Sequence, residues 1–187
     1  MTLKDYKRQH LRAPLVSPFV YSRAGRVLKG LVENISEGGM LLKHMPPLHL
    51  DEEIWGVFEI VQYPVFSHYK FDELNLMDRK SFNSQIIRVQ IRPVRKVELK
   101  GEGNIVSRYI GVVFLDHHNE KKIVVSDYVK TFTKNIIFLL KKIESNIGNG
   151  EMSEIRLLAE LLGYPKEIKI SNLRQKVLHD YQNLQWA

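Results

Sequence analysis

The spacing of apolar side chains changes once along this chain, after Asp116. Before that residue, apolar and polar side chains mostly alternate, which is the period of β-strands that bury one face. The alternation predicts six strands, at residues 17–22, 26–35, 39–44, 54–62, 82–94 and 104–116. Six short antiparallel strands would leave unpaired edges in an open sheet, so the pattern favours a small closed barrel.

Beyond Asp116, apolar side chains recur every three or four residues, the period of an α-helix with one buried face. The pattern predicts helices over 119–146, about 151–162 and about 171–185, the last with Ser171 as its N-cap. Residues 63–80 are too long for a hairpin and rich in aromatics, so they should fold back on the body, and Trp55 is also expected to pack inside. The expected fold class is mainly β with α: a six-stranded antiparallel β-barrel followed by C-terminal helices.

The composition excludes several kinds of site. The chain has no cysteine, which excludes disulfides, thiolate metal sites and thiol catalysis. Its seven histidines are scattered, and the neighbours Asp116, His117 and His118 would point to opposite faces of a strand, so no metal site is expected. No motif of a hydrolase or a phosphate-binding loop occurs, so an enzyme is not expected.

Two further features concern location. No secretory signal pattern is present, and the longest apolar run of the C-terminal part, Ile136–Leu140, is far too short to cross a bilayer. A cytoplasmic protein without a membrane span is therefore expected.

Charge is distributed unevenly along the chain, whose formal net charge is +7. Residues 1–30 hold seven basic residues and one acidic, residues 31–78 two basic and nine acidic, and residues 79–100 seven basic and one acidic. The two basic segments indicate either an anionic partner on the N-terminal segment, alongside 79–100, or simply solvated surfaces. A small anion needs only a few arginines, whereas DNA or RNA would call for a broader basic surface with interleaved aromatics, so neither is expected.

The first candidate motif lies in the N-terminal basic segment. Arg8 and Arg12 stand four residues apart, Lys7 precedes the first, and Pro14 follows closely. A guanidinium group can donate two hydrogen bonds to a phosphate or to the O6/N7 edge of guanine. Alone, this spacing is common in basic chains and usually means two exposed charges.

The second candidate motif is Asn-x-Ser-x-x-Gly, formed by Asn34, Ser36 and Gly39 where the second predicted strand turns into the third. Alternation places the Asn34 and Ser36 side chains on one face, where an amide and a hydroxyl can read the edge of a base. Gly39 allows a ligand or a backbone to come close. Alone, these residues are also those of any turn.

Together the two motifs, about twenty residues apart, resemble the PilZ family of cyclic di-GMP receptors, over roughly residues 6–142. The strand 109–114, which contains Gly111 and precedes a helix, fits the same resemblance. The resemblance implies a six-stranded barrel that binds this bacterial second messenger across its outside. It assigns phosphate and guanine contacts to Arg8 and Arg12, guanine hydrogen bonds to Asn34 and Ser36, and an open surface to Gly39. Lys7 and Gly38 would support the site, and Lys7 favours a stacked pair of ligands over one.

The resemblance also suggests how the chain is organised. Residues 1–14 would be a flexible N-terminal loop that clamps the ligand, 15–146 the PilZ-like barrel with its following helix, and 147–187 a helical extension. The expected function is a cyclic di-GMP receptor with no other cofactor, which signals to a protein partner by ordering its N-terminal loop. The C-terminal helices lie outside the resemblance, and their apolar stripes indicate either packing on the barrel or a surface that the partner reads. A PilZ-like interaction module with a vestigial ligand site stays open as the alternative. A barrel that binds single-stranded nucleic acid would need stacking aromatics near the basic loop, and only Tyr6 and Phe19 are close.

Overall fold

A computed structural model describes residues 10–46, 48–50, 52–100, 106–115, 119–145 and 152–185. Its strands form a closed barrel in the order β1-β2-β3-β6-β5-β4, in which every neighbouring pair is antiparallel. The strands are β1 (Arg12–Arg23), β2 (Arg26–Ser36), β3 (Gly39–Lys43), β4 (Ile54–Val61), β5 (Ser84–Lys100) and β6 (Val106–Phe114). The predicted barrel is therefore confirmed. Closure pairs β3 with β6 and pairs β1 with β4 at Val20 and Tyr21, so every strand has a partner on each side.

The first strand begins earlier than the alternation predicts. Arg12 is its first residue and pairs with Ser36, so Arg12 lies on a strand and not on a loop. Pro14 hid this extension, because proline cannot donate to a strand ladder and usually marks a strand's end. The structure accommodates it at an irregularity of register between Pro14 and Ser17, where β1 bulges away from β2.

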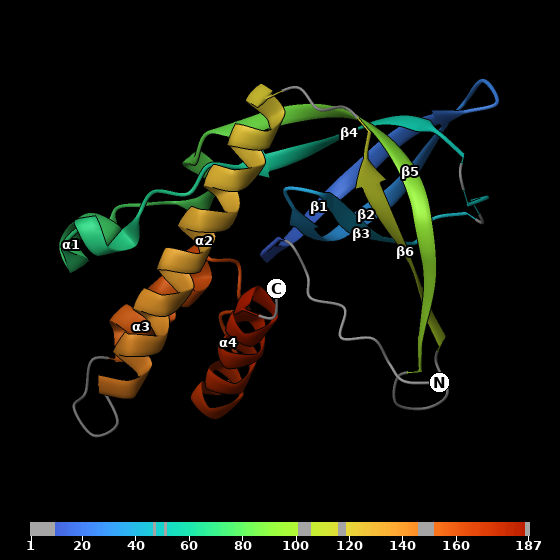
Figure 1. Ribbon diagram of the computed structural model, residues 1–187. Helices are drawn as coiled ribbons and strands as arrows, with labels where there is room; N and C mark the ends of the chain where they lie inside the picture. Colours follow the sequence, from blue (N-terminus) through green and yellow to red (C-terminus); the bar gives the residue numbers. More distant parts are fainter. Residues whose placement is uncertain are drawn as a thin grey trace.

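Three helices follow the barrel and lie together on one side of it (Figure 1). They are α2 (Asn119–Ser145), α3 (Met152–Leu161) and α4 (Ile170–Gln185), close to the predicted ranges. Helix α2 packs against β1 and β2, and α4 packs against α2 and β1. The predicted apolar stripe of α2 is buried in the common core: Val125, Val129, Phe132, Ile136, Leu139 and Ile143. No helix in the described ranges is long and apolar enough to span a bilayer.

The N-cap predicted for α4 is wrong. The helix begins at Ile170, and the N–H of Leu173 donates to the carbonyl of Lys169, so Lys169 occupies the cap position. The hydroxyl of Ser171 instead lies 3.4 Å from the amide oxygen of Asn172. A serine near the start of a helix predicts a boundary, but the first hydrogen-bonded turn decides which residue is the cap.

The aromatic insertion folds back as expected, through the short helices η1 (Phe66–His68), α1 (Phe71–Asn75) and η2 (Arg79–Ser81). Phe66 and Leu74 are fully buried. Asn135 of α2, which is 1% exposed, holds the insertion in place. Its amide oxygen accepts from the N–H of Phe66 at 2.9 Å, and its amide nitrogen donates to the carbonyl of Pro64 at 2.8 Å.

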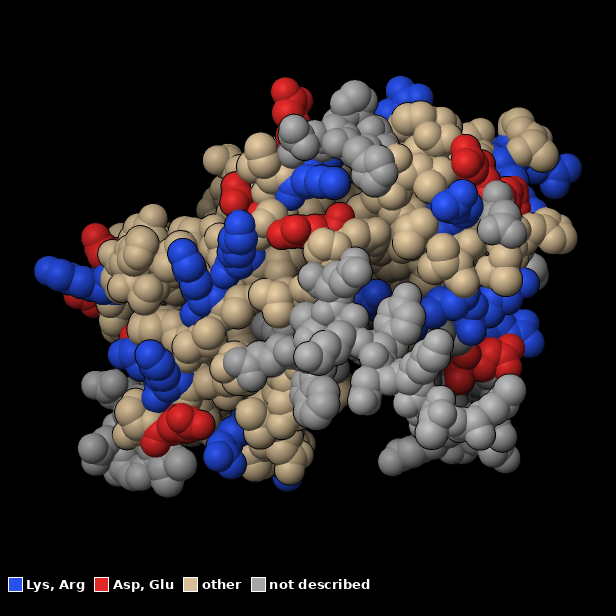
Figure 2. Space-filling model, in the orientation of Figure 1, with Lys and Arg blue, Asp and Glu red and all other residues tan. Residues whose placement is uncertain are grey.

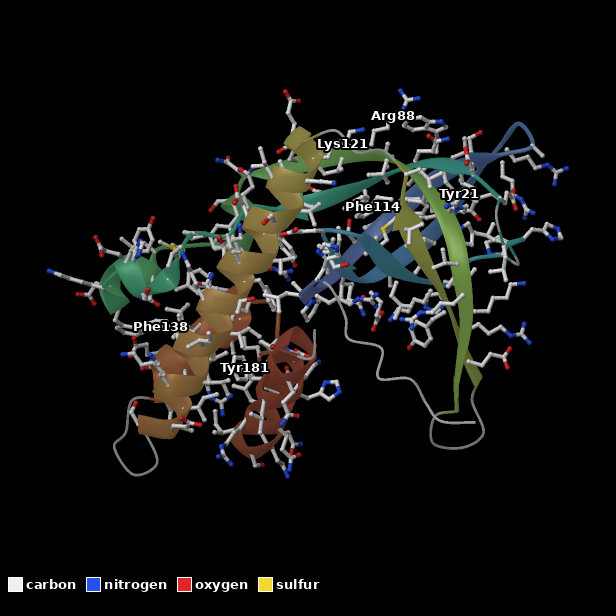
Figure 3. All side chains as sticks on the ribbon, in the orientation of Figure 1. Tyr21, Arg88, Phe114, Lys121, Phe138 and Tyr181 are labelled. Carbon is white, nitrogen blue, oxygen red and sulfur yellow. The ribbon has the colours of Figure 1, made fainter. Side chains whose placement is uncertain are left out.

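Trp55 was expected inside and is not. It alternates with the buried Ile54 and Gly56 on β4 and is 43% exposed. The guanidinium carbon of Arg88 lies 4.8 Å from the centre of the indole, on the outer surface of the barrel (Figure 3). A cation on the open face of a tryptophan stabilises both groups without burying either.

Candidate functional site

The two sequence motifs meet at one end of the β1–β2 pair. Arg12 is directly opposite Ser36, and Pro14 is opposite Asn34. In antiparallel strands, residues directly opposite each other project from the same face. The structure therefore brings Arg12, Asn34 and Ser36 to one patch of the outer surface, as the motif spacing predicts. Arg8 and Lys7 lie outside the described residues.

His10, the first described residue, lies over the corner between β2 and β3. Its ring Nδ1 is 3.7 Å from a carboxylate oxygen of Glu37. A Cβ atom added to Gly38 would lie 2.9 Å from the His10 ring, so the imidazole covers this glycine. The segment ahead of Arg12 thus reaches the Asn-x-Ser-x-x-Gly corner. Sequence reasoning missed His10, because a single histidine beside a basic motif carries no pattern of its own.

The corner is built by Ser36 and Gly39. The Ser36 hydroxyl donates to the carbonyl of Gly39 at 3.1 Å, and the Ser36 side chain is buried. A Cβ atom on Gly39 would overlap the carbonyl oxygen of Val112 on β6. Gly39 therefore lets the backbone of β6 approach β3 closely. The resemblance implies a different role for Gly39, which is to leave the surface open for a ligand.

Asn34 offers an unused hydrogen-bond acceptor. Its amide oxygen is buried, and within the described part of the chain it accepts no hydrogen bond. Buried polar atoms normally have partners, so this amide oxygen can accept a hydrogen bond from a donor that reaches it. The N–H groups of a guanine edge are donors of the required kind.

Irregularities of register surround this patch. They lie between Pro14 and Ser17 in β1, between Val32 and Asn34 in β2, and between Pro93 and Arg95 in β5. A β-bulge bends its strand and re-aims the side chains beside it, and bulges are frequent next to functional sites. Two of these strands, β1 and β2, change course beside the patch itself, and β5 does so farther round the barrel.

Tyr128 of α2 ties this patch to the helices. Its hydroxyl donates to the carbonyl of Pro14 at 2.6 Å, two residues beyond Arg12. Burial raises the pKa of Tyr128 well above its ordinary value, and nearby Tyr63 adds to the effect. The hydroxyl therefore stays protonated and can act as a donor at any physiological pH.

A cavity of about 430 Å³ lies behind the Pro14–Pro18 stretch, between the barrel and the helices. Tyr63, Arg79, Tyr128, Tyr164, Lys176 and Asp180 are among its lining residues. The Tyr164 hydroxyl donates to Asp180 at 2.7 Å, and burial raises the pKa of Tyr164. In the described ranges, no three His, Asp or Glu side chains come together as metal ligands would.

Comparison with known proteins agrees with this fold. The family model of the PilZ domain matches residues 6–130. No curated protein matches the sequence.

Solved structures with a similar fold include three proteins, all at low identity. The inhibitor of motility MotI/DgrA of Bacillus subtilis has a TM-score of 0.46 and 13% identity, over 65% of this chain and 48% of that one. The PilZ domain with c-di-GMP of YcgR from Escherichia coli has a TM-score of 0.43 and 15% identity, over 77% of this chain and 98% of that one. The MrkH–c-di-GMP complex of K. pneumonia has a TM-score of 0.44 and 15% identity, over 74% and 54%. The chain thus spans about half the length of MotI/DgrA and of MrkH.

Proposed function

Because this chain belongs to the PilZ domain family, we propose that it is a receptor for cyclic di-GMP. The ligand would lie on the outer face of the barrel, between the N-terminal arginines and the β2–β3 corner. The observation that carries the proposal is the pairing of Arg12 with Ser36, next to the orphaned amide oxygen of Asn34. A cation and an unused acceptor on one surface suit a ligand with both phosphates and guanines.

Each motif residue has a proposed role. Arg8 and Arg12 bind phosphate and guanine, Asn34 accepts from a guanine N–H, and the Ser36 oxygen accepts a further hydrogen bond while its proton goes to Gly39. Lys7 and Gly38 support the site. Gly38 does so by leaving room for His10, whose ring would otherwise be pushed away from the corner.

We propose further that ligand binding clamps the N-terminal segment onto the barrel and that α2 receives this change. The route is short: Arg12 and Pro14 are two residues apart on β1, and Tyr128 holds the Pro14 carbonyl. A ligand shifts a conformational equilibrium only by the difference in its binding free energy between the two states. Here that difference would come from the contacts that the clamped segment makes with the ligand. A protein partner that reads the C-terminal helices would receive the signal.

A PilZ-like interaction module with a vestigial site is the second candidate. It predicts that Arg12, Asn34 and Ser36 have no ligand in common. Arg8 and Arg12 are both present, which favours the receptor, because a vestigial site would be expected to lose its arginines.

Titration calorimetry of the purified chain with cyclic di-GMP tests the proposal, with GTP and cyclic GMP as competitor controls. We expect Arg8→Ala and Arg12→Ala each to weaken binding about tenfold to a hundredfold, since a hydrogen bond to a charged group contributes roughly 1.5–3 kcal/mol. Arg174→Ala, at an exposed position of α4, is the matched control and should leave affinity unchanged. Equal affinity in all three variants, or no binding by the unaltered chain, would refute the proposed site or the proposed function respectively.

The coupling to α2 has its own test. Tyr128→Phe removes the hydrogen bond to Pro14 and is expected to lower the free energy of unfolding by about 1–2 kcal/mol. It should also reduce the protection from hydrogen exchange that cyclic di-GMP adds to α2 amides. Tyr69→Phe, at an exposed position of the insertion, serves as control. If ligand protects α2 equally in both variants, the signal does not pass through Tyr128.

A further inference from the structure

Two arginines of β5 share the outer face that carries the proposed site. Cross-strand pairing places Arg12, Ser36, Gly39, Val113 and Arg92 in one row across β1, β2, β3, β6 and β5. The next row along the barrel is Pro14, Asn34, Leu41, Gly111 and Arg95. Residues in such a row project from the same side of the sheet. Each row thus begins in the β1–β2 motif region and ends at an arginine of β5.

The inward and outward positions of β5 support this assignment. Ile91 is fully buried and Pro93 is buried, so Arg92 between them points outward. The register shift after Pro93 then turns Arg95 to the outer face opposite Gly111. The rows span four strand spacings of about 4.8 Å, or about 19 Å along the curved surface.

Because Gly111 has no side chain, the Arg95 side chain can lie directly over it. A Cβ atom at Gly111 would lie 2.7 Å from Cγ and 2.8 Å from Nε of Arg95. The stem of Arg95 therefore lies across β6 toward β3, where Leu41 is the next residue of the row. Any larger residue at position 111 would push this arginine away from the site.

Arg92 and Arg95 make no ion pair within the described ranges, whereas Arg108 pairs with Glu98 and Lys43 with Glu33 nearby. Figure 2 shows Lys and Arg side chains, with Asp and Glu among them, on the right of the view, where β5 and β6 lie in Figure 1. Cations without carboxylate partners on one face are suited to an anionic ligand.

We propose that Arg92 and Arg95 form a second cationic wall of the ligand site, facing Arg12 across Leu41 and Gly111. This inference rests on the proposed function and extends it. The ligand would be held from both ends: by Arg12, Asn34 and Ser36 on one side and by the two β5 arginines on the other. Arg95 would offer its planar guanidinium to a guanine edge or a phosphate, while Leu41 supports the apolar face of a base.

A site with cations at both ends favours a ligand that carries phosphate or guanine at both ends. A cyclic dinucleotide can reach both walls, whereas a mononucleotide can occupy only one. The second wall is therefore a specificity determinant. Its removal should lower the affinity for cyclic di-GMP and leave the affinity for cyclic GMP unchanged.

Calorimetry with cyclic di-GMP tests the second wall with Arg95→Ala and Arg92→Ala. We expect at least a tenfold loss of affinity in each. Arg88→Ala is the matched control, because Arg88 lies on the same strand and carries the same charge, yet pairs with β4 and stacks on Trp55. It should change affinity less than twofold. All three positions are at least partly exposed, so melting temperatures close to that of the unaltered chain are expected and should be measured.

Two more variants separate geometry from charge. Arg95→Lys keeps the charge without the planar fork and is expected to restore little of the loss. Gly111→Ala keeps Arg95 but displaces it, and is expected to weaken binding severalfold. If Arg92→Ala and Arg95→Ala both behave like Arg88→Ala while Arg12→Ala loses affinity, the second wall is refuted and the proposed function stands. No binding by the unaltered chain would refute both.

Discussion

Asn135→Ala is expected to lower the free energy of unfolding by about 2–6 kcal/mol. The substitution leaves two backbone groups of the insertion without a partner, the N–H of Phe66 and the carbonyl of Pro64. Each buried group that loses its partner costs about 1–3 kcal/mol. No water can easily replace the amide, because Asn135 is 1% exposed and Phe66 is fully buried. The insertion should detach from α2 as the protein loses stability.

Urea unfolding followed by circular dichroism measures this change. Asn172→Ala is the control, because Asn172 lies at an exposed position of α4. It is expected to change the free energy of unfolding by less than about 0.5 kcal/mol. A loss below 1 kcal/mol for Asn135→Ala would mean that the insertion is held chiefly by its apolar side chains, Phe66 and Leu74.

Gly39→Ala is expected to cost about 3 kcal/mol, at the upper end of the usual penalty for overpacking. The added methyl group would overlap the carbonyl oxygen of Val112, which is part of the ladder that closes the barrel. A backbone atom in a paired strand cannot move aside as the tip of a side chain can. The β3–β6 pair must therefore separate locally, and the corner beside Ser36 must shift with it.

The adjacent glycine provides the control. A methyl group on Gly38 would meet only the His10 ring, which can rotate away, so Gly38→Ala should cost less than about 1 kcal/mol. Thermal unfolding of both variants measures the difference, and cyclic di-GMP titration shows whether each retains the site. Similar losses for Gly38→Ala and Gly39→Ala would show that the turn, and not the approach of β6, requires glycine.

Most of the fold can be predicted from the sequence, because the spacing of apolar residues matches the side chains that each strand and helix buries. Alternation identified six strands and the helical period identified three helices, since each element buries one continuous face. The deviations occur where a local signal competes with a long-range contact. Residues 1–14 were expected to be a loop, but β1 begins at Arg12 and accommodates Pro14 beside a bulge. Ser171 indicated a cap but lies inside the first turn of α4. Trp55 appeared to be a core residue, yet its place in the alternation puts it outside.

The candidate site was only partly visible. The two motifs named Arg12, Asn34, Ser36 and Gly39, and the structure brings these residues together. Their contacts with a ligand remain a prediction. The β5 arginines could not be singled out from the sequence, because the charge of segment 79–100 does not tell which of its basic residues face β6. That information depends on strand order and on the register shift after Pro93, both of which are set by barrel closure.

The bond between Tyr128 and the Pro14 carbonyl has a consequence for regulation. One end of β1 contacts both the proposed ligand site and the helical layer. If cyclic di-GMP and a partner both act through it, as proposed, each must change the affinity for the other by the same factor. A partner that binds α2 or α4 more tightly when the ligand is bound must raise the affinity for the ligand by the same factor. Under the proposed function, the abundance of that partner would then set the affinity for cyclic di-GMP without any change in the ligand site itself.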